Sequence, residues 1–313
     1  MTRKIIIDCD PGIDDAAALC IALFDPRVEV LAITATAGTV DSDQATCNVT
    51  SILQHLDPSR YPRIGKASVP DDAAVIDDRH LNGPDGLGGC HFQDSARQHL
   101  LPSGKVIAEL LRQHPGQVTI VCLGPLTNLS KLFQRDPGVV PLIDKIVISG
   151  GSVSHPGNVT AAAEFNMYFD ALASRDVLAS ATTKSMVPLD VTDALRFGVD
   201  LLERLPSKNT RAGDLLHRIF SYAFRAAHQQ LGRELIPLRD AATLMAVIEP
   251  DLFTWRNMAG RVETKGELTR GVTVFDQRMR REWPLNMEVA VGVDEEAVKE
   301  MVLRGLKYAG QET

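Results

Sequence analysis

The chain has 313 residues, of which 40 are acidic and 33 are basic, so its formal net charge at pH 7 is −7. This acidic balance argues against nucleic acid as a partner and leaves no basic stripe for a membrane surface. No apolar run reaches the length of a membrane span, and the start at Met1 lacks a signal-peptide pattern. The five cysteines do not indicate a disulfide framework. A cytoplasmic protein is therefore expected.

Short apolar segments alternate with amphipathic segments along most of the chain. Buried strands rich in Val and Ile are predicted at residues 5–7, 28–36, 118–123, 146–149 and 186–189. Helices are predicted between them at residues 15–24, 42–56, 105–113, 126–133 and 171–179. This alternation predicts an α/β fold with a doubly wound, mostly parallel sheet flanked by helices. No linker or charge run divides residues 1–313, so a single domain is expected.

The C-terminal third of the chain has a different pattern. Residues 212–232 form a long helical stretch, and strands are predicted at 261–263, 272–275 and 287–291. These strands predict an antiparallel addition to the parallel sheet. A final helix at 295–306 closes the predicted fold.

Four carboxylates fall within eight residues directly after the first predicted strand. They are Asp8, Asp10, Asp14 and Asp15. Unpaired carboxylates this close together repel one another strongly. A hard divalent cation that prefers oxygen ligands would make the arrangement favourable, so the sequence indicates a metal site.

Other interpretations fit this acidic stretch less well. Asp14 and Asp15 are suited to capping the helix that follows, but capping does not account for the two carboxylates on the strand side. An EF-hand loop starting at Asp8 requires glycine at its sixth position and glutamate at its twelfth, and the chain has isoleucine and leucine there. A phosphotransferase with Asp8 as its aspartyl nucleophile stays open as an alternative.

Candidate segments follow three of the predicted strands. The acidic cluster follows the first strand, Leu123 ends a middle strand, and Gly150 and Gly151 follow the next. Parallel sheets of this kind bind ligands at the carboxyl ends of their strands. The three segments are therefore expected to meet in one site.

Residues 8–16 closely resemble the opening motif of the inosine–uridine nucleoside hydrolases. Residues 123–129, the region 149–166 and residues 240–242 resemble three further motifs in the order of that family. Four motifs in the same order, spread across nearly the whole chain, are specific evidence for a resemblance to this family. The resemblance implies the nucleoside-hydrolase type of α/β fold, a homodimer or homotetramer, and a calcium-dependent N-glycosidase that splits a ribonucleoside into ribose and free base.

The resemblance also assigns roles to individual residues. The implied Ca²⁺ ligands are Asp10, Asp15, Asp240 and the backbone carbonyl of Leu123. Asp10 also resembles the residue that takes a proton from the metal-bound water. The implied ribose contacts are Asp14, Asn158, Glu164 and Asn166.

These residue types suit ribosyl chemistry without reference to the family. Positive charge develops on the sugar ring as the C–N bond breaks, and nearby carboxylates stabilise it. Calcium makes water a stronger acid, an adjacent aspartate collects the proton, and asparagine amides suit vicinal hydroxyls. Taken alone, Asn158 is equally consistent with a turn residue. Asp240 taken alone is better explained as a helix N-cap, a role that is compatible with metal binding through its other oxygen.

Position 239 departs from the family pattern because it is Arg. Many members have His there, proposed to protonate the departing base, and purine-preferring members have an aromatic residue. A guanidinium is a poor proton donor, but it can stack on the base, hydrogen-bond a pyrimidine carbonyl or hold an anion. In the alternative interpretation, Arg239 pairs with a carboxylate near the metal and never meets substrate.

Two further departures lie near the predicted substrate. Thr39 stands where the family commonly has Asn near the ribose. Residues 79–88 resemble the mobile loop over the base, with Asn82 where His is often found and His80 two residues earlier. The remaining candidates for substrate contact are Phe165, Tyr222 and His228.

The first functional hypothesis is therefore a calcium-dependent ribonucleoside hydrolase. The second is a ribose- or nucleoside-binding protein with weak or no hydrolysis, which Arg239 and Asn82 motivate because both replace plausible proton donors. The third is a metal-dependent phosphohydrolase with Asp8 as nucleophile, which magnesium dependence and phosphate release would distinguish. The base preference stays open.

Overall fold

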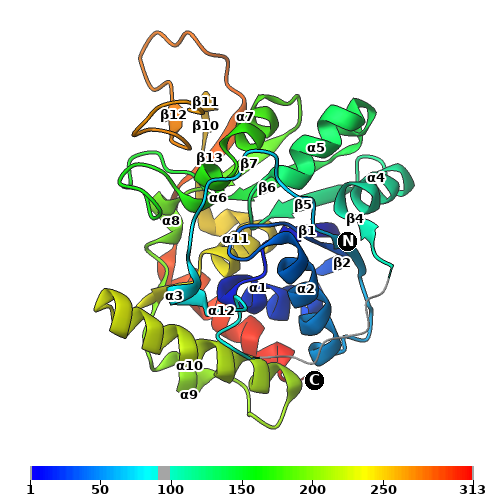
Figure 1. The fold of residues 1–313 in the computed structure, drawn as a ribbon, viewed down its shortest axis with the longest axis vertical. Coiled ribbons are helices and arrows are strands. Elements are labelled where there is room, and N and C mark those ends of the chain that lie inside the picture. The colour runs from blue at the N-terminus through cyan, green and yellow to red at the C-terminus, as the bar shows by residue number, and fades with distance from the viewer. Residues whose placement is uncertain (1, 91–98, 312–313) are drawn as a thin grey trace.

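The computed structural model describes residues 2–90 and 99–311. Within these residues, nine strands form one sheet with helices on both faces (Figure 1). The strand order is β10-β13-β7-β6-β5-β1-β2-β3-β4. The strands of this sheet are β1 Arg3–Cys9, β2 Val28–Ala35, β3 Arg63–Lys66, β4 Leu101–Pro102, β5 Val118–Cys122, β6 Lys145–Ser149, β7 Lys184–Val187, β10 Phe253–Met258 and β13 Met287–Val293.

Two small antiparallel pairs complete the strands of the described residues. They are β8 Arg196–Phe197 with β9 Ile236–Pro237, and β11 Gly260–Val262 with β12 Thr273–Phe275. The helices are α1 Ile13–Phe24, α2 Ser42–Leu56, α3 Arg79–Asn82, α4 Ser103–Gln113, α5 Thr127–Arg135, α6 Phe165–Phe169, α7 Ala171–Ala179, α8 Leu189–Thr192, α9 Leu201–Arg204, α10 Arg211–Leu231, α11 Arg239–Ile248 and α12 Glu295–Ala309, with 3₁₀ turns at Pro137–Leu142 and Pro250–Leu252. None of the described helices is both long and apolar enough to cross a bilayer.

The predicted doubly wound, mostly parallel sheet is confirmed. Every neighbouring pair in the large sheet is parallel except β10 with β13. The predicted antiparallel addition is also present, as the β10–β13 pair and the β11–β12 hairpin. The strand predicted at 287–291 forms part of β13, which lies parallel to β7 and antiparallel to β10.

The side chains of the central strands divide between two hydrophobic cores, one on each face of the sheet. In β1, Ile5 and Ile7 pack with α1, α2, α10, α11 and α12, whereas Ile6 packs with α4, α5 and α7. Successive strand residues point to opposite faces, so a strand covered on both faces must be apolar throughout. This double coverage explains why the Val- and Ile-rich runs were recognisable as strands.

The sequence predictions were wrong or incomplete at several elements. β7 is Lys184–Val187, two residues earlier than predicted, because Pro188 ends it and α8 begins at Leu189. β3 and β10 were not predicted, since both carry exposed polar or charged side chains and lack a continuous apolar run. Asp240 is not the N-cap of α11, because that position belongs to Leu238.

The strand order places a topological switch point between β1 and β5. From β1 the chain continues through β2, β3 and β4 toward one edge of the sheet, and it then returns to β5 on the other side of β1. Ligands of doubly wound folds bind in the crevice outside the carboxyl ends of the strands at such a point. The segments after β1 and β5 therefore meet where a site is expected.

Candidate active site

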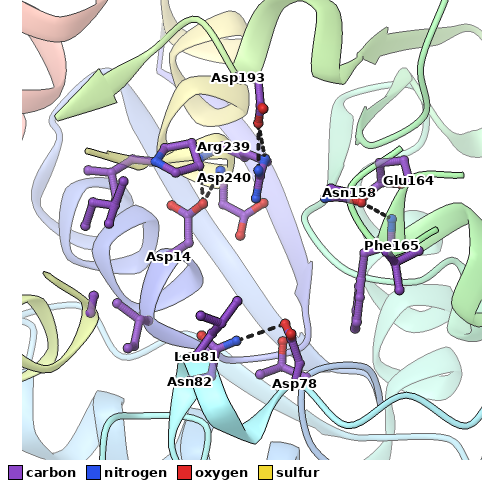
Figure 2. A pocket seen from close by; sticks show the side chains of 18 of the residues that line it. Asp14, Asp78, Leu81, Asn82, Asn158, Glu164, Phe165, Asp193, Arg239 and Asp240 are labelled. Carbon is purple, nitrogen blue, oxygen red and sulfur yellow. Dashed lines mark hydrogen bonds and ion pairs between the residues drawn. The ribbon is translucent and has the colours of Figure 1, made fainter. Parts of the chain in front are cut away.

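A cavity of about 820 Å³ lies at the carboxyl ends of the central strands. The acidic stretch enters it directly, because β1 ends at Cys9 and α1 begins at Ile13. Other walls come from α3, the segment before α6, and the first turn of α11 (Figure 2). The predicted site residues that line it are Asp10, Asp14, Asp15, Thr39, His80, Asn82, Leu123, Asn158, Glu164, Phe165, Asn166, Arg239 and Asp240.

The Asp10 carboxylate is held from one side and tightly surrounded by backbone. Its Oδ2 accepts hydrogen bonds from the backbone N–H of Thr39 at 2.8 Å and from the Thr39 hydroxyl at 3.0 Å. A Cβ at either Gly38 or Gly124 would overlap the Asp10 carboxylate. Glycine at both positions therefore makes room for this side chain.

Asp14 and Asp15 each use one oxygen to cap a helix. Asp15 Oδ2 accepts from the backbone N–H of Gly12 at 3.0 Å, which closes the start of α1. Asp14 Oδ2 accepts from the backbone N–H groups of Arg239 at 2.5 Å and Asp240 at 3.1 Å, so it caps α11 rather than its own helix. The Oδ1 atom of each aspartate is buried without a hydrogen-bond partner.

Burial raises the pKa of the four carboxylates at the floor of the cavity, which are Asp10, Asp14, Asp15 and Asp240, and repulsion by neighbouring carboxylates adds to the effect at all of them except Asp15. Burial raises the pKa of Asp14 to about 7 and that of Asp15 to about 6. Burial, followed by the charge of Asp15, raises the pKa values of Asp10 and Asp240 well above their usual range. Ionising all four groups therefore requires compensating positive charge.

The donor set at this floor fits a hard cation. Carboxylate oxygens and the Leu123 carbonyl are the ligand types that calcium prefers, and two carboxylate oxygens there have no other partner. Within the described residues, no three His, Cys, Asp or Glu side chains form a ready-made metal-binding group. A cation at the floor would therefore require the backbone oxygen of Leu123 in addition to carboxylates.

The opposite wall presents the predicted ribose contacts. Glu164 is the N-cap of α6, and its carboxylate accepts from three backbone N–H groups, those of Gly151, Asn166 and Met167. Burial still raises its pKa. The Asn166 amide donates to the carbonyls of Leu123 at 2.7 Å and Ser149 at 3.0 Å, which ties the ends of β5 and β6 together.

Asn158 also contributes to the order of this wall. Its Oδ1 accepts from the backbone N–H of Phe165 at 2.8 Å (Figure 2). The Phe165 ring lines the cavity and stacks on Phe169 with the ring centroids 6.0 Å apart. The turn interpretation of Asn158 and its place in the cavity are compatible, because this contact uses Oδ1 and not Nδ2.

Arg239 lies in the cavity, paired with a carboxylate that the sequence did not single out. Its Nε and Nη2 atoms both donate to Asp193 Oδ1, at 2.8 and 2.6 Å. The pairing foreseen in the alternative interpretation therefore exists, but with Asp193 and not with a floor carboxylate. Arg239 still lines the cavity and keeps about a quarter of its side chain exposed, at 27%.

The segment predicted as a mobile loop contains the short helix α3. The Asn82 amide donates to Asp78 Oδ2 at 3.2 Å, and both side chains line the cavity (Figure 2). His80 also lines the cavity, with Nδ1 at 3.2 Å from the carbonyl of Asp77. Residues 79–82 therefore form a wall of the site opposite the first turn of α11.

Three sequence candidates are not brought to the cavity. Tyr222 packs beside Gly88, and His228 is exposed and pairs with Glu234 at 2.8 Å. Neither lines the cavity in this conformation. Asp8 is fully buried, and its Oδ1 accepts from Thr34 at 2.6 Å and Asn128 at 2.8 Å. Asp8 therefore cannot serve as a nucleophile toward a ligand in this cavity.

Sequence reasoning missed several residues on the arginine side of the cavity. Asp193 lines it and faces two arginines, Arg239 and Arg196 at 3.4 Å, and the imidazole of His155 at 3.8 Å. Asp78 is a further cavity carboxylate. The available signal for Asp193 was its place just after a predicted strand, at the same edge of the sheet as the acidic stretch.

Comparisons with known proteins agree with this geometry. The model of the family described as inosine-uridine preferring nucleoside hydrolase matches residues 5–300. The non-specific ribonucleoside hydrolase RihC of Salmonella paratyphi C is 35% identical over 306 residues, covering 97% of this chain and 98% of that protein. RihC of Salmonella typhi is also 35% identical, over 305 residues and 97% of both chains.

Two solved structures share the fold closely. A plant nucleoside hydrolase, the PpNRh1 enzyme, has a TM-score of 0.91 at 29% identity, covering 98% of this chain and 99% of that one. A purine-preferring ribonucleoside hydrolase from Gardnerella vaginalis has a TM-score of 0.90 at 26% identity, covering 99% of both chains.

The buried contact between Asp8 and Asn128 predicts a stability effect. Asn128→Ala removes one of the two side chains that hydrogen-bond Asp8. It also removes one of the two that hydrogen-bond the Ala35 carbonyl, which accepts from Asn128 at 2.7 Å and from Ser103 at 3.1 Å. The free energy of unfolding should fall by about 2–4 kcal/mol, because a buried acid loses one of its two side-chain donors. Urea unfolding in the presence of a chelator measures it. A loss no larger than that of the exposed control Asn209→Ala would contradict the role of Asn128.

Proposed function

This chain belongs to the inosine-uridine preferring nucleoside hydrolase family, and we propose that it hydrolyses the N-glycosidic bond of ribonucleosides to ribose and free base, with calcium bound at the cavity floor. The observation that carries the proposal is the set of four buried carboxylates at the topological switch point. Their type and number suit a reaction in which positive charge develops on a sugar.

Asp10, Asp15, Asp240 and the Leu123 carbonyl would hold the calcium ion. When bound, calcium neutralises the crowded carboxylates and makes water a stronger acid. Gly12 and Ser149 support this assignment, because each occupies one oxygen of Asp15 or Asp240 and so orients the carboxylate. Such outer hydrogen bonds are a regular feature of metal ligands in proteins.

Asp10 accepts the proton of the attacking water in the proposed reaction. Thr39 holds Asp10 Oδ2 through two hydrogen bonds, so the carboxylate has a fixed orientation. A positioned carboxylate that takes a proton in the transition state contributes roughly 10²–10⁴-fold to the rate. As the C–N bond breaks, the negative floor also stabilises the cationic sugar ring.

Asp14, Asn158, Glu164 and Asn166 bind the ribose hydroxyls in this proposal. All four line the cavity, and their carboxylates and amides offer the acceptors and donors that vicinal hydroxyls require. The base then lies beside Phe165, between α3, which carries His80 and Asn82, and the first turn of α11. Because no linker or charge run divides residues 1–313, the chain is also proposed to form one domain. The family resemblance implies a homodimer or homotetramer, which light scattering tests.

The experiment that tests the activity is base release from purine and pyrimidine ribonucleosides, with and without a chelator. The relatives named non-specific and purine-preferring make a broad panel necessary. We expect release that the chelator abolishes and calcium restores. Retained binding of ribose without any base release would favour the alternative of a binding protein, and release of phosphate from sugar phosphates would favour a phosphohydrolase.

Substitution of Asp10 tests the proposed proton acceptor. Asp10→Asn keeps the shape of the side chain but removes its basicity, so kcat should fall by at least about 10²-fold. Steady-state kinetics on the best substrate of the panel measure it. Activity within a few-fold of the parent, in a variant that still binds calcium, would exclude Asp10 as the proton acceptor.

The close approach of Gly38 to Asp10 gives a second test of the same carboxylate. Gly38→Ala should displace the Asp10 side chain, since the new Cβ would overlap it, and so reduce calcium affinity and kcat by about 10-fold or more. Gly104→Ala is the matched control, because its Cβ would meet only Leu132 Cβ, at 3.7 Å. Equal kinetics for the two variants would contradict the proposed role of this contact.

The raised pKa values predict how stability depends on pH and calcium. Asp14 and Asp15 have folded pKa values of about 7 and 6, above the unfolded value of 3.8, so their contribution to stability is complete below that value and is lost as pH rises through 4 to 7. The metal-free protein should therefore melt at a lower temperature at pH 8 than at pH 5.5. Calcium should raise the melting temperature by roughly 5 °C or more at pH 8, and by less at pH 5.5.

Asp240→Asn provides the control for this pH dependence, because it removes one of the repelling charges. This variant should reduce both the pH dependence and the calcium effect. A metal-free parent protein that is more stable at pH 8, with no response to calcium, would contradict the assignment of a cation to the floor.

A further inference from the structure

Arg239 is anchored in the cavity at both of its ends. Its backbone N–H donates to Asp14 Oδ2 at 2.5 Å, and its guanidinium donates twice to Asp193 Oδ1. Figure 2 shows Arg239 between Asp193 and the carboxylates of Asp14 and Asp240. An arginine held in this way loses little further freedom when it meets a ligand.

The guanidinium of Arg239 acts on carboxylates from several sides of the cavity. Its positive charge works to lower the pKa values of Asp14, Asp78, Glu164 and Asp193, which come from separate segments of the chain. Both hydrogen bonds to Asp193 leave from Nε and Nη2. Among the described residues, no hydrogen bond occupies Nη1, so that group is available to a ligand.

We propose that Arg239 stabilises the departing base as a fixed cation, and that Asp193 is the positioning residue that aims its guanidinium. This inference rests on the proposed hydrolase function. Arg239 directly precedes Asp240 and hydrogen-bonds Asp14, so it borders the carboxylate floor where the sugar is proposed to bind. A base attached to that sugar is therefore within its reach.

The chemistry differs from proton donation by a side chain. The C–N bond breaks with its electron pair passing to the base, and the guanidinium donates hydrogen bonds to the heteroatom that gains the negative charge. Arg239 keeps its proton throughout, because a guanidinium is not deprotonated in proteins. The attacking water forms the new C–O bond and gives its proton to Asp10, and the released base takes a proton from solvent.

A second possible donor lies in the same wall. His155 lines the cavity with Nε2 at 3.8 Å from Asp193 Oδ2, and its Nδ1 lies 2.8 Å from the carbonyl of Pro156. The shorter contacts of Asp193, at 2.6 and 2.8 Å, are those to Arg239. The carboxylate therefore orients the arginine more strongly than the histidine, and the experiment must separate the two.

The test compares two leaving groups that differ in how much stabilisation they require as they depart. Nucleosides require stabilisation of the departing base, whereas 4-nitrophenyl β-D-ribofuranoside releases an anion that is already stable. Arg239→Met should lower kcat/KM for inosine and uridine by about 10²–10³-fold, the effect of losing one preorganised donor. For the nitrophenyl riboside the loss should be about threefold or less.

Conservative and matched variants accompany this comparison. Arg239→Lys should recover part of the nucleoside activity, because it keeps the charge but not the fork of donors. Asp193→Asn should lower kcat for nucleosides more than for the nitrophenyl riboside, a selectivity that a merely structural role would not produce. Arg256→Met, at an exposed arginine of β10, is the control and should match the parent on both substrates.

Three outcomes would overturn the inference. Equal losses on both substrates in Arg239→Met would show that the arginine only supports the carboxylate floor. Full nucleoside activity in Arg239→Met, with a selective loss in His155→Gln, would make His155 the donor. A parent protein that cleaves neither substrate would refute the hydrolase function itself, which distinguishes that failure from failure of the role of Arg239.

Discussion

Repulsion among the buried carboxylates of Asp10, Asp14, Asp15 and Asp240 is the constraint on which the rest of the site depends. Four such groups are stable in one place only if hydrogen bonds, proton uptake or cations offset their charge. The surrounding chain supplies the first of these through the backbone N–H groups of Gly12 and Thr39, the first turn of α11, and the hydroxyl groups of Thr39 and Ser149. Asp14 Oδ1 and Asp15 Oδ1 are left buried without hydrogen-bond partners. These two unsatisfied oxygens are the physical reason for proposing a cation.

The cavity has two parts that differ in charge and therefore suit different parts of the substrate. The floor is negative and suits a sugar on which positive charge develops. The wall around Asp193 gathers arginine and histidine side chains and suits a leaving group on which negative charge develops. Because Arg239 connects to both parts, through its backbone to Asp14 and through its side chain to Asp193, the two charge distributions are held in one geometry.

The sequence predicted the fold well because its strongest signals are local. Strands covered on both faces must be apolar throughout, so β1, β2, β5 and β6 were recognisable, and the placement of polar segments after them indicated one site. The partner of Arg239 was not predictable, since Asp193 is 46 residues away and its role depends on a tertiary contact. Tyr222 and His228 were predicted to contact the substrate but do not line the cavity, because position along α10 alone does not decide which of its side chains reach it.

The measurement that most directly tests the central claim is calorimetric titration of calcium into chelator-treated protein at pH 6. Two buffers with different ionisation enthalpies reveal both the ions bound and the protons released. Because the floor carboxylates have raised pKa values, the account predicts one calcium ion per chain and a net release of protons on binding. Absence of calcium binding, or binding without proton release, would contradict the claim that this floor is built for a cation.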